Sequence, residues 1–180
     1  MSSEKSGIGL GLQYGVATGF VYLALLLLRY LVFGANVPAF NALKFISYFI
    51  LAGMFVVTIL ARRKQLGGYA DAKQLFQPVF MVVLVAEITY SLFSCIYLNF
   101  IDPGFMDGFM ERTVEYLKNN GAPLEIVNQQ IALAKEQAAV KAAPSGYLQG
   151  LATWIVLDSI LALLLCIFLK KNKPAHLPGS

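Results

Sequence analysis

The sequence predicts an all-α membrane protein: a four-transmembrane-helix bundle with an extracytoplasmic amphipathic helical hairpin between the third and fourth helices. Two observations support this prediction. Hydrophobic residues make up 58% of the 180-residue chain and charged residues only 13%, whereas a soluble domain carries about 25% charged residues. Four apolar runs also approach or exceed the roughly 20 helical residues that cross a bilayer. These runs, which we expect to form one integral membrane domain, cover residues 8–33, 41–61, 75–100 and 147–169.

The first run is expected to be a retained span that packs closely against another helix. It is too long for the core of a signal peptide and lacks a small-x-small cleavage site at its end. Gly11, Gly15 and Gly19 recur every four residues, so they line one helix face where a neighbouring backbone can approach closely. We expect this face to meet a helix of the same chain, and formation of a homodimer is the alternative.

Arg29 is a cation near the far end of the first run. The stem of an arginine can lie along apolar surface while its guanidinium reaches the membrane interface, which is the favoured interpretation. The alternative is an interfacial ion pair with Asp102, which should lie on the same side of the membrane.

The second run ends in a basic segment, and a turn leads from there into the third run. Arg62–Lys64 closes the second helix, and Gly67 and Gly68 break it. Asp71 followed by Gln74 resembles a capping box, in which the aspartate accepts a backbone N–H bond at the start of the third helix.

The segment 102–146 separates the third and fourth runs and is rich in polar residues. Asp102 and Pro103 predict a helix start, with the aspartate as cap and the proline at the first helical position. Apolar residues then recur on one face, as in an amphipathic helix; they are Met106, Met110, Val114 and Leu117. Pro123 opens a second helix, so the segment is predicted to be a helical hairpin outside the hydrocarbon.

The distribution of charge predicts the orientation of the chain. The loop between the second and third runs carries four basic residues against one acid, and the tail 170–180 carries three lysines and no acid. The segment 102–146 carries six acids against four basic residues. Lys and Arg near span ends concentrate on the cytoplasmic side, so both termini should be cytoplasmic and the hairpin extracytoplasmic. The basic loop and tail would then face an anionic lipid surface.

Several of these features occur together in one known family. They are the glycine-rich first span, the Arg-Arg-Lys end of the second, Gly67 and Gly68 before the third helix, Ile101–Pro103 before an amphipathic insert, and the terminal lysines. In this combination the chain resembles the family called domain of unknown function 4199, small four-span bacterial membrane proteins common in the Bacteroidetes. The resemblance covers nearly the whole chain and implies four spans in a bacterial inner membrane. That family has no assigned activity, so the resemblance transfers no functional residue.

Two acids interrupt the apolar runs at matching depth. At about 1.5 Å per helical residue, Glu87 lies about 18 Å along the third span from Leu75, and Asp158 about 16 Å back from Leu169. The hydrocarbon core is about 30 Å thick, so both acids fall near its midplane. A carboxylate there costs several kcal/mol unless it is neutral, paired or hydrated. Glu87 and Asp158 are therefore the candidate ion or proton site.

The acid pair has two interpretations. Two carboxylates in one dry site cannot both ionise cheaply, so they could hold one proton or one cation, as in a small transporter. Alternatively, a protonated acid donates to a neighbouring oxygen and only fixes the register of the helices. The test is whether the acids line a hydrated cavity or are sealed among side chains. Hydroxyl groups that could join the site belong to Thr18, Tyr22, Thr89, Tyr90, Ser91, Ser94, Thr153 and Ser159.

Motifs for other functional classes are missing from the sequence. The only histidine, His176, lies in the tail, so there is no catalytic triad and no metal-ligand spacing. No phosphate-binding loop or other cofactor motif occurs, and the basic segments are too short to bind nucleic acid. Cys95 and Cys166 should lie near opposite ends of the bilayer, too far apart for a disulfide.

We therefore expect a non-enzymatic structural or accessory protein of the inner membrane. Besides the lipid bilayer, its expected partner is a membrane or periplasmic protein that binds the hairpin. The alternative is a small proton- or cation-coupled transporter that uses Glu87 and Asp158.

Overall fold

The computed structural model describes residues 7–141 and 144–172 and is all-α, as predicted. Its helices, with two short π-helical turns η1 and η2, are α1 (Gly7–Leu27), η1 (Leu28–Val32), α2 (Val37–Gln65), α3 (Ala72–Ile96), η2 (Tyr97–Ile101), α4 (Phe105–Asn119), α5 (Leu124–Lys141) and α6 (Pro144–Leu169). Within the described residues, four helical segments are long and apolar enough to cross a membrane: Gly7–Val32, Val37–Gln65, Ala72–Ile101 and Gly146–Leu169. This arrangement indicates a multi-pass membrane protein. The predicted tail from Lys173 onward, with His176, lies outside the described residues.

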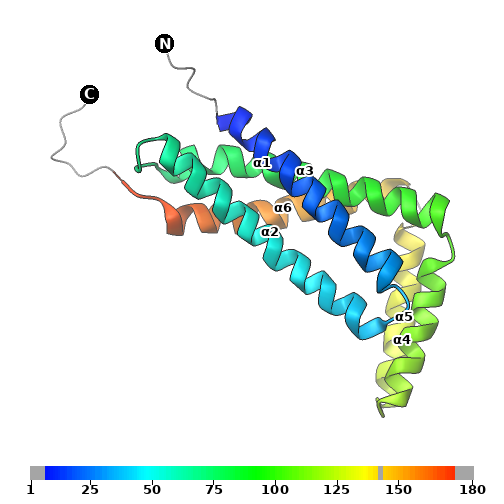
Figure 1. The fold of residues 1–180 in the computed structure, drawn as a ribbon. Helices are drawn as coiled ribbons and strands as arrows, with labels where there is room; N and C mark the ends of the chain where they lie inside the picture. The colour runs from blue at the N-terminus through cyan, green and yellow to red at the C-terminus, as the bar shows by residue number, and fades with distance from the viewer. Residues whose placement is uncertain (1–6, 142–143, 173–180) are drawn as a thin grey trace.

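Helix α3 is the central span of the bundle. It contacts α1, α2 and α6, and Figure 1 shows these helices running along one another. The core consists of fully buried apolar side chains of α2 and α3, among them Phe55, Ile59, Val79 and Val83. Helix α6 contributes a narrower stripe of buried residues at spacing four, Asp158, Ala162 and Cys166.

The outer face of the bundle is apolar. Phe49 on α2 is 79% exposed and Phe168 on α6 is 80% exposed, and similar residues lie along α1 and α3. Soluble proteins rarely expose apolar surface on this scale. These side chains are therefore expected to contact lipid.

The three glycines of α1 face α3 of the same chain. A Cβ atom added at Gly11 would lie 2.6 Å from the carbonyl oxygen of Pro78, and one at Gly15 would lie 3.1 Å from Cγ2 of Val85. At Gly19 the nearest atom would be Oγ1 of Thr89, at 3.2 Å. The glycine face thus allows α1 and α3 to approach more closely than side chains would permit.

The turn between α2 and α3 contains the predicted capping box. Oδ1 of Asp71 accepts a hydrogen bond from the N–H of Gln74 at 2.7 Å, and Oε1 of Gln74 accepts one from the N–H of Asp71 at 3.1 Å. Gly67 and Gly68 precede it with φ of 76° and 89°, values that glycine adopts without steric cost. The capping-box prediction is therefore confirmed.

The predicted cap at Asp102 is wrong. Helix α4 begins at Phe105, with Gly104 at the N-cap position and no side-chain cap hydrogen bond. The third span continues through η2 as far as Ile101, so Asp102 ends that span instead of starting the next helix. Its N–H donates to the carbonyl oxygen of Tyr97 at 2.8 Å, and its own carbonyl oxygen accepts from the N–H of Phe105 at 3.1 Å.

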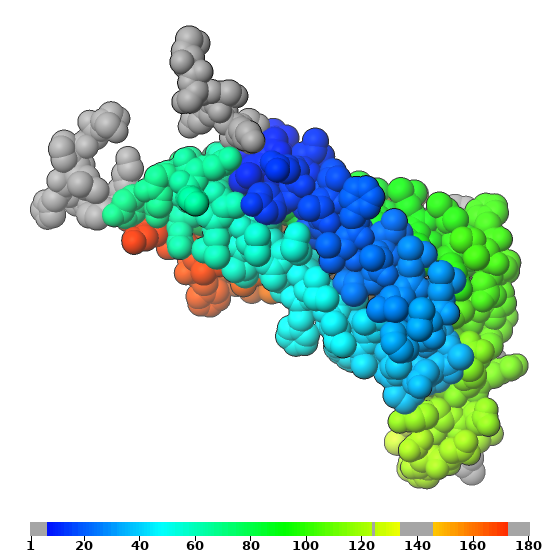
Figure 2. Space-filling view, in the orientation of Figure 1, coloured from blue at the N-terminus to red at the C-terminus, as the bar shows by residue number. Residues whose placement is uncertain are grey.

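Helices α4 and α5 form a hairpin at the end of the bundle opposite Gly7 and Leu169. They run steeply across the ends of the spans (Figure 1), and α4 is seen to extend beyond α1 and α2 in the space-filling view (Figure 2). An aromatic cluster anchors the hairpin at its base; it consists of Tyr30, Phe40, Phe93, Tyr97, Phe105 and Phe109. The guanidinium of Arg112 also donates to the carbonyl oxygen of Gly34 at 3.4 Å. The predicted hairpin thus exists as an element, and its side of the membrane stays a prediction.

Candidate functional site

The two acids predicted from their depth lie together between α3 and α6. Glu87 is 3% exposed and Asp158 is 6% exposed. Their carboxyl groups are within hydrogen-bonding reach of one another. Oδ2 of Asp158 has no hydrogen-bond partner in the described part of the chain. The pair therefore satisfies its hydrogen bonding when one carboxyl group carries a proton and donates it to the other.

Local packing brings each acid to this interface. Glu87 follows Ala86 and lies one turn after Val83, and both of these neighbours are fully buried. Asp158 lies on the narrow stripe by which α6 packs, one turn before Ala162. Because an alanine follows at that position, α6 can approach α3 closely enough for the two carboxyl groups to meet.

Two tyrosines lie near the acid pair and a third lies near them, so each of the four spans contributes a residue to this region. Tyr22 on α1 and Tyr48 on α2 lie near enough to interact electrostatically with both acids, and Tyr90 on α3 interacts with both tyrosines. The rings of Tyr22 and Tyr90 are stacked, with centroids 6.2 Å apart. The ring of Tyr48 lies 6.0 Å from that of Trp154 on α6. We define Glu87, Asp158, Tyr22, Tyr48 and Tyr90 as the midplane cluster.

Five of the hydroxyl groups suggested by the sequence fall into two sets. Thr18, Thr89 and Thr153 each donate to a carbonyl oxygen one turn earlier in their own helix, at 2.7–2.8 Å, and so are occupied elsewhere. Ser94 and Ser159 have buried hydroxyl oxygens without a hydrogen-bond partner among the described residues. Sequence reasoning missed Tyr48, although its position near the middle of the second span was the signal that could have found it.

Arg29 lies at the hairpin end of the bundle, within η1, and is only 9% exposed. Its Nε donates to the carbonyl oxygen of Phe40 at 3.1 Å, and its guanidinium carbon lies 3.9 Å from the centroid of the Phe40 ring. A cation over an aromatic face is stabilised by about 0.5–2 kcal/mol. The ion pair with Asp102 that the sequence suggested is not formed within the part of the chain that the structure describes.

Metal-ligand groups and thiols can be followed in the residues that the structure describes. Across residues 7–141 and 144–172, no group of three or more His, Cys, Asp or Glu side chains is arranged to hold a metal ion. Cys95 on α3 and Cys166 on α6 are free thiols. The midplane cluster, in which both acids are buried, is thus the candidate site, and a pair of carboxyl groups is chemically able to hold a proton.

Comparison with known proteins places the chain in a family. No curated protein and no solved structure is significantly similar to it. The family model DUF4199, described as a protein of unknown function, matches residues 13–171. This range contains both acids of the midplane cluster, the hairpin and most of the four apolar segments. The chain therefore belongs to the DUF4199 family of proteins of unknown function.

Proposed function

We propose that the protein is a non-enzymatic structural or accessory protein of the bacterial inner membrane that binds a protein partner through its α4–α5 hairpin. The burial of the two acids, Glu87 and Asp158, is the observation that favours a structural protein over a transporter. Glu87 is 3% exposed and Asp158 is 6% exposed, so the pair is enclosed by side chains. Its role in this proposal is a contact that holds α6 to α3.

The hairpin has the features of a presented binding element. Its base is fixed by the aromatic cluster, in which the ring of Phe105 lies 4.9 Å from Tyr30 and 5.7 Å from Phe40. Its outer surface exposes large apolar side chains between charged ones, namely Met106, Tyr116, Ile126 and Leu133. Methionine and tyrosine are enriched in protein interfaces. An anchored projection with such a surface suits a protein partner better than it suits lipid.

The partner proposal is tested with photo-crosslinking residues in the full chain in native membranes. A probe in place of Tyr116, on the hairpin, is expected to give one discrete adduct with another protein, and a probe in place of Ile126 the same adduct. The control is Phe49, which is 79% exposed on α2 and should give lipid adducts alone. Adducts only with lipid at all three positions, or only with a second copy of this chain, would contradict the proposal.

The proposed orientation has both termini in the cytoplasm and the hairpin in the periplasm. The structure supports it by gathering the basic segments at one end of the bundle: Ala70 and Lys171 pair as an antiparallel bridge, which joins the loop after Arg62–Lys64 to the end of α6. The acids Asp107, Glu111 and Glu115 lie on α4 at the other end. Cytoplasmic segments are the basic ones.

Reporter fusions test this orientation. A fusion after Lys64 should be active only with a cytoplasmic reporter, and one after Lys118 only with a periplasmic reporter, because positive charge near span ends is retained inside. A fusion after Lys171 serves as a second cytoplasmic control. Periplasmic activity after Lys64 would overturn the assignment.

A second candidate function is a small proton- or cation-coupled transporter. The observation in its favour is that two carboxyl groups from different helices meet between α3 and α6, at the depth where the span lengths predict the membrane midplane. Intramembrane acids often mark proton or ion pathways. A carrier should lose proton-dependent uptake in proteoliposomes after Glu87→Gln. A structural pair should tolerate that change, since the amide keeps the hydrogen bond.

A further inference from the structure

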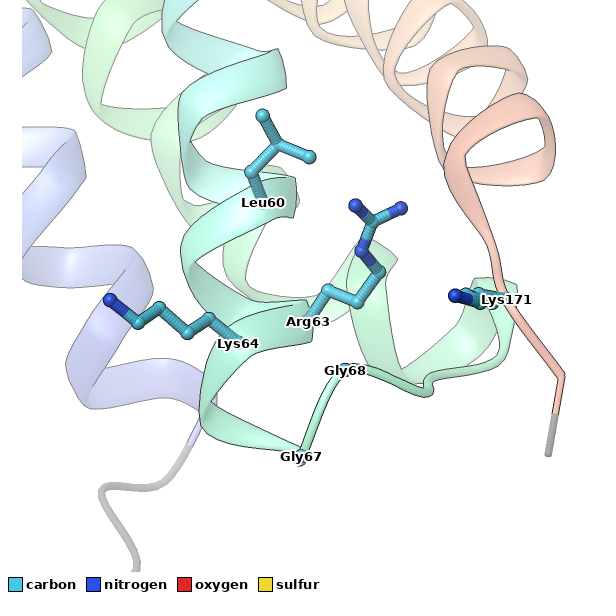
Figure 3. Close-up of a pocket in the computed structure, with 6 residues that line it drawn as sticks. All are labelled: Leu60, Arg63, Lys64, Gly67, Gly68 and Lys171. Atoms are coloured by element: carbon cyan, nitrogen blue, oxygen red, sulfur yellow. The ribbon is translucent and has the colours of Figure 1, made fainter.

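A pocket of about 420 Å³ lies at the end of the bundle opposite the hairpin, where the α2–α3 turn meets the end of α6. Its lining residues are Leu60, Arg63, Lys64, Gly67, Gly68 and Lys171. Figure 3 shows the side chains of Arg63 and Lys171 on the same side of α2, between that helix and α6, while the side chain of Lys64 extends toward α1. Two cations from distant parts of the sequence therefore flank one opening.

Both of these cations are held in place. Nη1 of Arg63 donates to the carbonyl oxygen of Leu169 at 3.1 Å, which fixes the guanidinium against the last turn of α6 and leaves further N–H donors of its fork for other acceptors. The main chain of Lys171 is fixed by two hydrogen bonds to Ala70, at 2.9 and 3.1 Å. Its Nζ lies 5.3 Å from the ring centroid of Tyr69.

The positive charge of the pocket is not balanced by an acid. Arg63, Lys64 and Lys171 form no ion pair with Asp or Glu within the described residues, and the nearby Asp71 uses a carboxylate oxygen in the capping box. The C-termini of α2 and α6 point here, but each contributes only about −0.5 charge. Three cations therefore leave an excess of positive charge that an anion can neutralise.

The shape of the pocket indicates which anion fits. Leu60 forms its apolar wall and is 41% exposed on the outer face of α2, where the apolar residues contact lipid. The pocket thus joins a cationic end to a lipid-facing side. A free phosphate ion would fill only the cationic end, whereas an anionic phospholipid matches both, with its phosphodiester between Arg63 and Lys171 and its acyl chains along α2.

We propose that this pocket binds the headgroup of an anionic phospholipid. The fork of Arg63 suits two phosphate oxygens at once, and Lys171 acts as a point charge on the other side. Basic pockets at the ends of membrane helices commonly hold such headgroups. Occupation would connect the α2–α3 turn to α6 through the lipid as well as through the backbone bridge.

The test compares the full chain in phosphatidylcholine nanodiscs with and without phosphatidylglycerol. The anionic lipid is expected to raise the melting temperature of the natural protein. The double variant Arg63→Gln/Lys171→Gln should lose this rise, with about a 25-fold loss in affinity, since each charge near the surface contributes about a fivefold factor. The matched control is Lys73→Gln/Lys170→Gln, which removes the same charge from exposed residues at the same end that do not line the pocket and should keep the rise.

Three results would overturn the proposal. The first is an equal loss of the melting-temperature rise in the pocket and control variants, which would mean general attraction to the lipid surface. The second is no rise with phosphatidylglycerol in the natural protein. The third is an equal rise with inorganic phosphate in phosphatidylcholine alone, which would mean a free-anion site. Because Arg63 also bonds to Leu169, the single variant Lys171→Gln against Lys170→Gln serves as the comparison if the double variant does not fold. A rise in Lys171→Gln as large as that in Lys170→Gln would then count against the site.

Discussion

Alanine in place of Gly11 is expected to cause a large loss of stability, because it separates α1 from α3. The new Cβ would lie 2.6 Å from the carbonyl oxygen of Pro78 and 2.8 Å from the Cα of the same residue. It would also lie 2.8 Å from the Cβ of Met81. Two of these are backbone atoms that cannot rotate away, so α1 must move off α3. Overpacking of this kind costs about 1–3 kcal/mol, and we expect the upper end, measured as thermal unfolding in detergent.

The control for this experiment is Gly53→Ala on α2, where an added Cβ meets nothing within 4 Å. Both substitutions add one methyl group inside a helix and improve helix propensity by the same amount, about 1 kcal/mol. Their difference therefore measures the close contact alone. Gly15→Ala should fall between them, because its neighbour at 3.1 Å is the side chain of Val85, which can adjust. Equal melting temperatures for Gly11→Ala and Gly53→Ala would show that α1 does not pack on α3 as described.

Replacement of Glu87 by leucine is expected to destabilise the bundle by about 1–3 kcal/mol, the cost of leaving a buried polar group unsatisfied. The unsatisfied group is the carboxyl of Asp158, whose Oδ2 has no other partner among the described residues. Glu87→Gln should cost much less, since its amide N–H can donate to Asp158. The measurement is thermal unfolding in detergent, and Thr153→Leu on the exposed side of α6 is the polar-to-apolar control.

The double variant Glu87→Leu/Asp158→Leu tests whether the two acids act as a pair. When both partners become apolar, neither is left unsatisfied, so the double variant should be more stable than the sum of the single changes predicts. Coupling between groups in contact amounts to about 0.5–3 kcal/mol. Strict additivity would mean that the carboxyl groups do not interact, and would remove the basis for both the structural pair and the transport site.

The sequence predicted the positions of residues along the membrane normal better than it predicted their contacts. Span length and charge are one-dimensional properties, so the four spans, the capping box at Asp71 and the common depth of Glu87 and Asp158 could be read from it. The rotation of each helix about its axis is a property of packing. The position of Tyr48 beside the acids, and the choice of α3 as the partner of Gly11, depend on that rotation and became visible only in the structure.

The error at Asp102 and the surroundings of Arg29 have a related cause. Aspartate before proline is a strong local signal for a helix start, but the third span runs on through a π-helical turn and takes that aspartate as its end. For Arg29, the sequence predicted either the membrane interface or the acid Asp102 as the partner of the guanidinium. The actual partner is the carbonyl oxygen and ring of Phe40, which the turn after η1 brings back over the arginine.

The peripheral position of α6 has a consequence for biosynthesis. The chain emerges from its N-terminus, so α1, α2 and α3 are complete before Asp158 has been made. Glu87 must then enter the bilayer without Asp158, at a cost of several kcal/mol if it is ionised. It stays without this partner until the whole hairpin has been synthesised. Arrival of α6 supplies the second carboxyl group, so this helix satisfies a buried polar group that the first three spans leave without its partner. Completion of the polar contact therefore depends on a helix that is synthesised after the hairpin.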